Sequence, residues 1–447
     1  MTMTISMIAQ LLEEKKYNSL YEQLNTMNAV DIAEIMDELQ SEQAVRVFRL
    51  LSKDLAAEVF ANLPSDKQEF LIGCLTDAEL ERVTSDMFID DTVDLMHEMP
   101  ATIVKRILRV ANPADREVIN ELLNYPENSA GSIMTPEFMD LRENMTVGEA
   151  IEKIRREGID KETIYNCYIL DNSRILKGVI TVKDLLIAPL DTVVGDIMET
   201  NIISVHTLSD RESAVMAMKK YGLMTLPVVD SENRLVGIIT IDDAVDVIVD
   251  ESSEDIALIS AVNPSDAPYL KTSVVRHAFN RIPWLLLLMV TSIITGLIIS
   301  RYEEAFTAVP LLVTFLPMLM DTGGNSGSQA SALIISSLAT GELSPKDYFK
   351  VLWKEFRISI ICSIALAVAN GIRIFVQYGN WQIAMVVSLT LAGTVVCAKI
   401  IGCTLPMLAK RLGLDPALIS SPFITTIVDA FSVFLYFNIA IAILGKL

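Results

Sequence analysis

ALISSPFITTIVDAFSVFLYFNIAIAIL, residues 417–444, is an apolar stretch that contains one charged residue, Asp429. A helix needs about 20 predominantly apolar residues to cross a bilayer, so this stretch predicts a membrane span. An ionisable group at such depth is costly, and it usually faces a partner, a water-filled cavity or an ion. The alternative is a protonated or hydrogen-bonded carboxyl that packs between helices. We favour a functional role for Asp429 inside a membrane domain.

Four more apolar segments precede it, at residues 284–300, 309–337, 358–372 and 382–409, so we expect an all-α domain of five membrane helices over residues 281–447. Basic residues are more numerous in one set of alternate connections, which places the N-terminal domains in the cytosol and the C-terminus outside. Eight lie on the cytosolic side and three on the other: Arg276, Arg281, Lys346, Lys350, Lys354, Arg357, Lys410 and Arg411 against Arg301, Arg373 and Lys446.

The charge is unevenly distributed along the 447 residues, whose formal net charge is −21. Residues 1–280 contain 49 acidic and 25 basic residues, whereas residues 281–447 contain 8 and 11. Clustered carboxylates repel phosphate and concentrate counter-ions, so this balance argues against nucleic acid and for cations as partners. The alternative is that the charge only aids solubility. Five cysteines and three histidines show no ligand spacing, so we expect neither a disulfide framework nor a zinc site.

Residues 1–130 contain an internal repeat, because leucine or methionine recurs every twelve residues. The series is Met27, Leu39, Leu51, Leu63, Leu75, Met87 and Met99. Amphipathic segments lie between these positions, and helix-start signals such as Thr76-x-x-Glu79 follow several of them. The pattern predicts an all-α superhelical array of short helices, ending near Tyr125-Pro126-Glu127-Asn128.

Residues 131–250 contain two copies of one α/β module. Ile133-Met134-Thr135 is echoed by Ile197-Met198-Glu199, and GVITVKD at 178–184 by GIITIDD at 237–243. Each copy combines an amphipathic helix, residues 147–156 and 211–221, with hydrophobic strands, residues 165–170 and 226–229 among them. The stretch resembles a pair of CBS regulatory domains. That resemblance implies candidate contacts to an adenine nucleotide such as ATP at Thr181, Asp184, Thr240 and Asp243.

Acidic residues crowd the connector at residues 246–280 and the end of the second module. Asp243, Asp246, Asp250 and Glu254 recur at helical spacing, so a helix here would present a stripe of like charges that repel one another. Asp90 and Asp94 form a similar i, i+4 pair earlier in the chain. Divalent cations with oxygen ligands, magnesium in particular, would relieve such repulsion. The alternative is a solvated charge run on a linker helix.

The second apolar segment contains PMLMDTGGNSGSQA, residues 317–330. Glycines at membrane depth are tolerated where helices pack closely or where the backbone lines a cavity. Asp321, Asn325 and Gln329 recur every four residues, so a helix presents their oxygens on one face. Either close helix packing or a wet pathway explains the segment.

The order of these parts closely resembles the MgtE family of magnesium channels over essentially the whole chain. The specific matches are YPENSAGSIMTP at residues 125–136, TGGNSGSQ at 322–329, and LGLDPA at 412–417 followed by Asp429. The resemblance implies a homodimer in the plasma (inner) membrane. It also implies Asp429 as the selectivity carboxylate for hydrated Mg²⁺, with Asn325 beside it and Asp321, Ser328 and Gln329 lining the pore.

The resemblance further implies that regulatory magnesium binds between acidic parts of the chain. The connector becomes a plug helix that shuts the pore when cytosolic Mg²⁺ is high, and repulsion opens it when Mg²⁺ falls. The implied regulatory residues are Asp90, Asp94, Asp210, Glu212, Asp243, Asp246, Glu251, Glu254, Asp255 and Asp415. Asp321 and Ser328 depart from the family motif, in which glycine and asparagine occupy these positions, so the charge near the pore differs here.

Two other functions compete with a channel gated by magnesium. One is an exchanger that couples cation movement to sodium or protons, and the other is a membrane sensor or enzyme regulated by adenine nucleotide. The sequence contains no Walker loop, no HExxH motif and no clustered nucleophile with a base, so we do not expect an enzyme.

Overall fold

The computed structural model describes residues 5–265, 269–270, 272–303, 309–419 and 421–445. The chain divides into two compact units, Met1–Ile248 and Val249–Leu447. Helix α15 (Ile241–Ile259) begins in the first unit and ends in the second. Each unit is described by itself.

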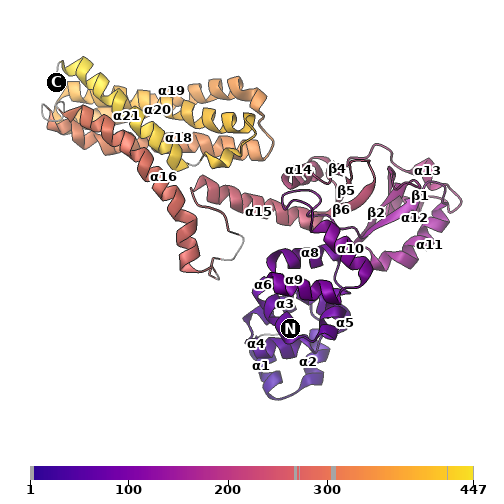
Figure 1. Ribbon diagram of the computed structural model, residues 1–447. Helices are drawn as coiled ribbons and strands as arrows, with labels where there is room; N and C mark the ends of the chain where they lie inside the picture. Colours follow the sequence, from indigo (N-terminus) through magenta and orange to yellow (C-terminus); the bar gives the residue numbers. More distant parts are fainter. Residues whose placement is uncertain (1–4, 266–268, 271, 304–308, 420, 446–447) are drawn as a thin grey trace. The chain divides into compact units, whose positions relative to one another are not determined.

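Ten short helices form the first part of unit one, as the twelve-residue repeat predicts (Figure 1). Each is eight to ten residues long, and a new helix begins about once per repeat. Thr76 and Glu79 form the predicted capping box, and Asn28 and Asn112 cap two other helices. The ten helices are α1 (Ile5–Glu13), α2 (Tyr17–Leu24), α3 (Ala29–Glu38), α4 (Ser41–Phe48), α5 (Lys53–Ala61), α6 (Ser65–Cys74), α7 (Asp77–Thr84), α8 (Ile89–Glu98), α9 (Ala101–Val110) and α10 (Pro113–Leu122).

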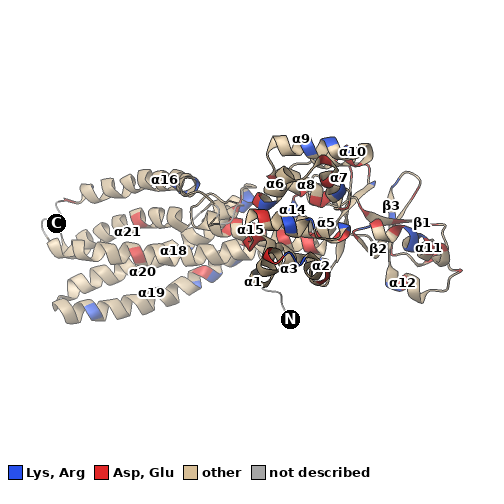
Figure 2. Cartoon of the chain, turned by 90° about the horizontal axis from the view of Figure 1, so that it is seen from below, with Lys and Arg blue, Asp and Glu red and all other residues tan. Residues whose placement is uncertain are grey.

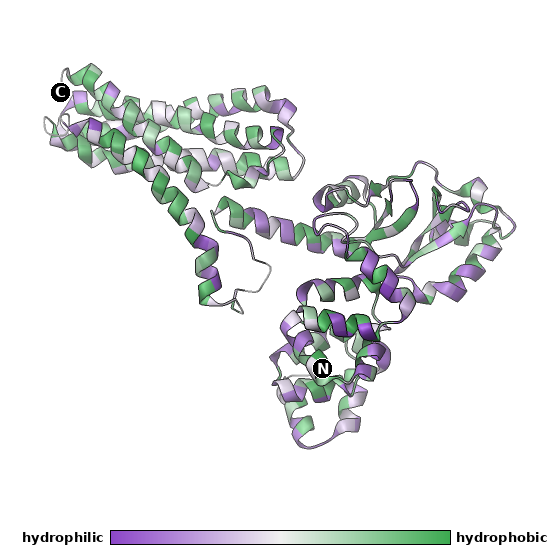
Figure 3. Cartoon of the chain, in the orientation of Figure 1, coloured by the Kyte–Doolittle hydropathy of each residue, from purple (hydrophilic) through white to green (hydrophobic). Residues whose placement is uncertain are grey.

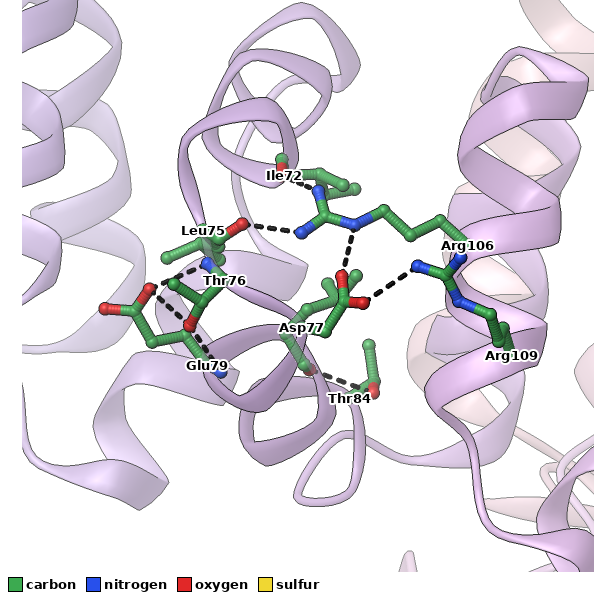
Figure 4. Close-up of polar contacts among 9 residues, drawn as sticks. Ile72, Leu75, Thr76, Asp77, Glu79, Thr84, Arg106 and Arg109 are labelled. Atoms are coloured by element: carbon green, nitrogen blue, oxygen red, sulfur yellow. Dashed lines mark hydrogen bonds and ion pairs between the residues drawn. The ribbon is translucent and has the colours of Figure 1, made fainter.

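Arg106 of α9 ties the array together across three repeats (Figure 4). Its guanidinium donates to the carbonyl oxygens of Ile72 (2.5 Å) and Leu75 (2.6 Å) at the end of α6, and to the Asp77 carboxylate (2.9 Å) at the start of α7. Arg109 donates to the other Asp77 oxygen at 2.8 Å. Because helix ends leave carbonyl groups without intrahelical partners, Arg106 satisfies groups that the short helices cannot satisfy themselves.

The two α/β modules have the same topology, a three-stranded sheet with one parallel and one antiparallel pairing. The first contains β1 (Phe138–Arg142), α11 (Val147–Glu157), β2 (Thr163–Leu170), β3 (Leu176–Thr181), α12 (Val182–Ile187) and α13 (Val194–Ile197); the second contains β4 (Val205–His206), α14 (Arg211–Tyr221), β5 (Thr225–Val229), β6 (Leu235–Thr240) and α15. Both long helices and the central strands were predicted, whereas the first strands β1 and β4 were not.

The residues of the repeated motifs connect each module to the other. Thr135 pairs its backbone with Ile238 of β6, and Glu199 pairs with Val179 of β3. The methionine before each crossing packs against a glycine: a methyl group at Gly237 would lie 2.9 Å from Cγ of Met134, and one at Gly178 would lie 2.8 Å from Cγ of Met198. The glycines of the echoed GVITVKD and GIITIDD stretches therefore admit these methionines.

The helical array shares one hydrophobic core with the second module. Side chains of both parts, including Ile107, Ile119, Met218, Leu226 and Ile239, belong to one buried cluster. The first module has a separate core. The helical array and the second module are therefore packed as one body.

The second unit is a bundle of long apolar helices (Figures 1 and 3). Among the described residues they are α16 (Val274–Arg301), α18 (Leu316–Ala339), α19 (Tyr348–Tyr378), α20 (Trp381–Arg411) and α21 (Ser421–Leu444). Four are long and apolar enough to cross a membrane, whereas α18, which contains the glycine-rich motif, is not among these four. It packs against α20 and α21, which bury its glycines and leave Asp321, Asn325 and Gln329 on its exposed face.

Candidate functional site

Glycines of α18 allow α20 and α21 to approach closely. A methyl group at Gly323 would lie 2.5 Å from Cγ2 of Thr394 on α20 and 2.9 Å from Cγ1 of Val428 on α21. A methyl group at Gly324 would lie 2.9 Å from Cγ2 of Thr425. Such contacts are possible only where a side chain is missing, which is how small residues bring membrane helices together. They also place this turn of α18 level with the turn of α21 that precedes Asp429.

The predicted polar face of α18 is exposed in the single chain. Asp321, Asn325 and Gln329 are all exposed, whereas Ser328 is half-buried. Asp429, half-buried on α21, interacts electrostatically with Asp321. The structure therefore brings together the two intramembrane carboxylates that the sequence singled out separately.

One buried ion pair in the bundle was not predicted. Lys399 of α20 and Glu355 of α19 are 6% and 7% exposed, and Nζ lies 3.9 Å from Oε2. Lys399 could have been found from the sequence, because it is a charged residue in an apolar segment. Its partner Glu355 could not, because that pairing depends on how α19 packs against α20. Each charge offsets the cost of burying the other.

The acidic residues of unit one gather where α8 meets the start of α15. Burial raises the pKa of Asp90 to about 6, with a further contribution from Asp91, and raises the pKa of Asp243 to about 7. Asp94 has its pKa raised to about 7 by desolvation and by the Asp90 and Asp243 charges. Asp91 and Asp94 are exposed, whereas Asp90 and Asp243 are half-buried, so desolvation acts mainly on Asp90 and Asp243. The predicted pair Asp90 and Asp94 thus faces Asp243.

Two members of this acidic cluster were missed from the sequence. Glu137 precedes β1 and accepts a hydrogen bond from the amide of Ile89 at 2.9 Å, and burial raises its pKa to about 7. Glu162 precedes β2, and burial and Asp90 raise its pKa to about 8. Oδ1 of Asp90 and Oε2 of Glu162 are buried without a hydrogen-bond partner in the described part of the chain. Glu137 and Glu162 lie just before strands and not in a helical stripe of acids, so helical spacing gave no signal.

The remaining predicted regulatory residues of unit one lie elsewhere. Asp246 is exposed on α15, one turn after Asp243. Asp210 caps α14, where its carboxylate accepts from the amide of Ser213 at 3.1 Å, and Glu212 lies in the first turn of that helix. The Asp210 carboxylate therefore has a structural role at a helix start.

A second acidic group lies in unit two, at the end of α15 (Figure 2). Leu258 packs with Ile335 of α18 and with Ala417. Burial raises the pKa of Asp255 to about 6, followed by the charges of Asp415, Glu251 and Glu254. The carboxylate of Asp415 also accepts from the amide of Ala417 at 2.8 Å. The structure therefore brings Asp255, one of the predicted plug residues, to Asp415, with Glu251 and Glu254 near Asp255 on the same helix.

A cavity of about 460 Å³ lies between the two α/β modules. Thr181 and Asp184 line it, and Thr181 donates to the Asp184 carboxylate at 2.5 Å. Tyr168 and Thr225 also line it and share a hydrogen bond of 2.7 Å. Thr240 and Asp243 are not among its lining residues, because Asp243 belongs to the acidic cluster.

Among the residues that the structure describes, no three His, Cys, Asp or Glu side chains are grouped closely enough to ligate a metal ion. The acidic clusters are looser than a ligand cage. Magnesium releases its waters reluctantly and usually keeps several of them, so spaced carboxylates suit contact through water.

Membrane helices with an intramembrane carboxylate, attached to acidic cytosolic-type domains, define a cation-transport protein by class. Comparison with known proteins narrows the class. Residues 316–439 match a family described as the MgtE divalent cation transporter, residues 27–128 match the MgtE intracellular N domain, and residues 130–191 and 194–250 match CBS domains.

Similar proteins span nearly the whole chain. A magnesium transporter MgtE of Thermus thermophilus is 34% identical over 97% of both chains, and one of Bacillus subtilis is 30% identical over 98% of this chain and 96% of its own. A crystal structure of the cytosolic domain of the Mg²⁺ channel MgtE in complex with ATP is 35% identical, covers 55% of this chain and all of its own, and superposes with a TM-score of 0.52. The chain belongs to the MgtE family of magnesium transporters.

Proposed function

We propose that this chain forms a magnesium-selective channel of the plasma (inner) membrane, gated by intracellular magnesium. The observation that carries the proposal is Asp429: a half-buried carboxylate on an apolar helix, level with the polar face of α18. A carboxylate at this depth, with an amide such as Asn325 nearby, can hold a hydrated divalent cation without trapping it. Ser328 and Gln329 line the same path.

Gating rests on the two acidic groups. Asp90, Asp94, Asp243 and Asp246 in unit one, and Glu251, Glu254, Asp255 and Asp415 in unit two, repel one another when magnesium is scarce. Bound Mg²⁺ neutralises them and lets α15 act as a plug. Asp210 and Glu212 complete the proposed regulatory set.

The domain division that we propose is residues 1–130, 131–250, 246–280 and 281–447, with the first parts cytosolic and the C-terminus outside. A two-fold axis would pair each Asp429 with its symmetry mate, because C2 is the commonest oligomer symmetry. The cavity lined by Thr181 and Asp184 is the proposed ATP site, by analogy with the related cytosolic domain in complex with ATP.

Substitution of the pore carboxylate tests the proposal. In a strain that depends on this chain for magnesium, Asp429→Ala is expected to abolish Mg²⁺ uptake, and Asp429→Asn, which keeps the side-chain size, is expected to do the same. Glu342→Gln, which removes an exposed carboxylate beyond the end of α18, serves as the control and should transport normally. Full uptake by folded Asp429→Ala protein would refute the pore assignment.

Patch recording separates the channel from the alternatives. Current should follow the magnesium gradient alone and decrease when Mg²⁺ rises on the cytosolic face. A requirement for a sodium or proton gradient would favour an exchanger instead. ATP turnover that is lost in Asp429→Ala would favour a nucleotide-dependent enzyme.

A further inference from the structure

Asp321 and Asp429 occupy the same level of the bundle. Gly323, Gly324 and Gly327 of α18 contact Val428, Thr425 and Ile424 of α21, in that order. Because the residue numbers rise along α18 while they fall along α21, the two helices run antiparallel here. On this register, Asp321 and Asn325 bracket the turn of α18 that contacts Thr425 and Val428, the residue before Asp429. The two carboxylates are also close enough to interact electrostatically.

Neither carboxylate has a cationic partner in the described part of the chain. The buried lysine of the bundle, Lys399, is paired with Glu355 on α19. Two unneutralised carboxylates in an apolar environment repel each other and are costly to desolvate. A cation bound from outside the chain would neutralise them and offset that cost.

We propose that Asp321 is a second cation-binding carboxylate of the permeation path, which acts with Asp429 on one hydrated divalent cation. This inference rests on the proposed function and deepens it. Asp321 sets how tightly the path holds its ion: two negative charges per chain attract a divalent cation more strongly than one, and they slow its exit. Asp429 then remains sufficient for conduction, whereas Asp321 adjusts affinity and maximal rate.

The register also predicts how the path treats ions of different charge. Asn325 lies one helical turn from Asp321 on the same exposed face, so its amide oxygen can accept from the water shell of the same ion. An ion held through its water shell by two carboxylates and an amide should bind more tightly as its charge rises from one to two. The path should therefore be blocked by divalent cations when monovalent ions carry the current.

The test measures Mg²⁺ flux into liposomes that contain the purified full-length protein. Asp321→Asn is expected to raise the half-saturating Mg²⁺ concentration by about three- to tenfold, because removing one nearby charge weakens the attraction for a divalent ion. Asp321→Glu keeps the charge and should stay within about twofold of the parent. Glu342→Gln is the matched control for charge removal on the same helix's loop, and size-exclusion chromatography shows that each variant is folded.

The outcomes separate this inference from the proposed function. If Asp429→Asn abolishes flux while folded Asp321→Asn has an unchanged half-saturating concentration, the role of Asp321 is refuted and the channel stands. If Asp429→Asn conducts normally, the proposed function fails first. Loss of flux in both Asp321→Asn and Asp321→Glu would show a steric role and would also overturn the charge assignment.

Discussion

Carboxylates of unit one gather from four places, α8, the start of α15 and the segments before β1 and β2, whereas those of the membrane bundle come from two turns on α18 and α21. The first group is half-buried at the edge of water, and many loosely spaced charges respond to cation concentration in a graded way. The second is small and lies among apolar helices, where a single charge has a large effect. In the proposed function, the many carboxylates of unit one sense the Mg²⁺ concentration, and the few carboxylates among the apolar helices select the ion.

Asp77 provides a reference within unit one. The Arg106 hydrogen bond holds the pKa of that carboxyl below its usual value, with Arg109 contributing. In the described part of the chain, Asp90, Asp243 and Glu162 form no ion pair with a basic residue, and their pKa values are raised. A basic neighbour turns an acid into part of the scaffold, and its absence leaves an acid available to bind a cation.

The largest effect on gating is expected for substitutions at the end of α15. Combined substitution Glu251→Gln, Glu254→Gln and Asp255→Asn removes three negative charges from the acidic group near Asp415, so bound magnesium can no longer hold the proposed plug closed. The variant should conduct at cytosolic Mg²⁺ concentrations that silence the parent channel, measured by patch current. Asp250→Asn, an exposed neighbour on the same helix, should close normally. Retained closure in the triple variant would refute the plug.

A pH effect of intermediate size is expected in unit one. Asp90, Asp243 and Glu162 have folded pKa values of about 6, 7 and 8, above their usual 3.8, 3.8 and 4.5. The folded state therefore binds more protons than the unfolded state in this range, so the stabilisation is complete below the usual values and is lost as pH rises through the folded ones. The other charged groups that face the cluster are Asp91, Asp94, Glu98, Asp115, Asp242, Glu137 and Lys161.

Hydrogen exchange of the α8 amides measures this effect in the full-length protein without magnesium. After correction for intrinsic rates, protection should be lower at about pH 8 than at about pH 5.5. Saturating Mg²⁺ should remove the difference, because the cation replaces the protons. Equal protection at both pH values would mean that the cluster does not control the packing of α8.

The smallest expected effect concerns the reference pair. Arg106→Ala removes two hydrogen bonds to carbonyl oxygens at the end of α6, which should cost about 1–2 kcal/mol of stability in the helical array. The exposed Arg109→Ala variant loses only its Asp77 contact and should cost less. Thermal unfolding of unit one measures both, and the proposed gating by magnesium should persist in each. A shift in gating as large as that of the α15 variant would contradict the assignment of Arg106 and Asp77 to the scaffold.

Much of the architecture could be predicted because its signals are local. The twelve-residue repeat predicted the short helices, Thr76-x-x-Glu79 predicted a capping box, and the echoed motifs predicted two modules. Local signals failed for β1 and for β4, which has only two residues. They also failed for α15, which begins inside the second module at Ile241 and ends at Ile259, earlier than the predicted connector. Helix α18 was predicted as a span from its flanks, although its motif lowers its apolar character below that of the other four.

By itself, the sequence determined which residues carry charge in an apolar setting, because hydropathy and helical periodicity depend only on neighbours along the chain. Asp429, Asp321 and the acidic stripe of α15 were visible in this way. Only the tertiary structure decided which charges meet. Glu137 and Glu162 join Asp90 through strand topology, Lys399 finds Glu355 through packing of α19 on α20, and glycine contacts set Asp321 level with Asp429. Electrostatic interaction depends on distance in space, which spacing along the chain does not encode.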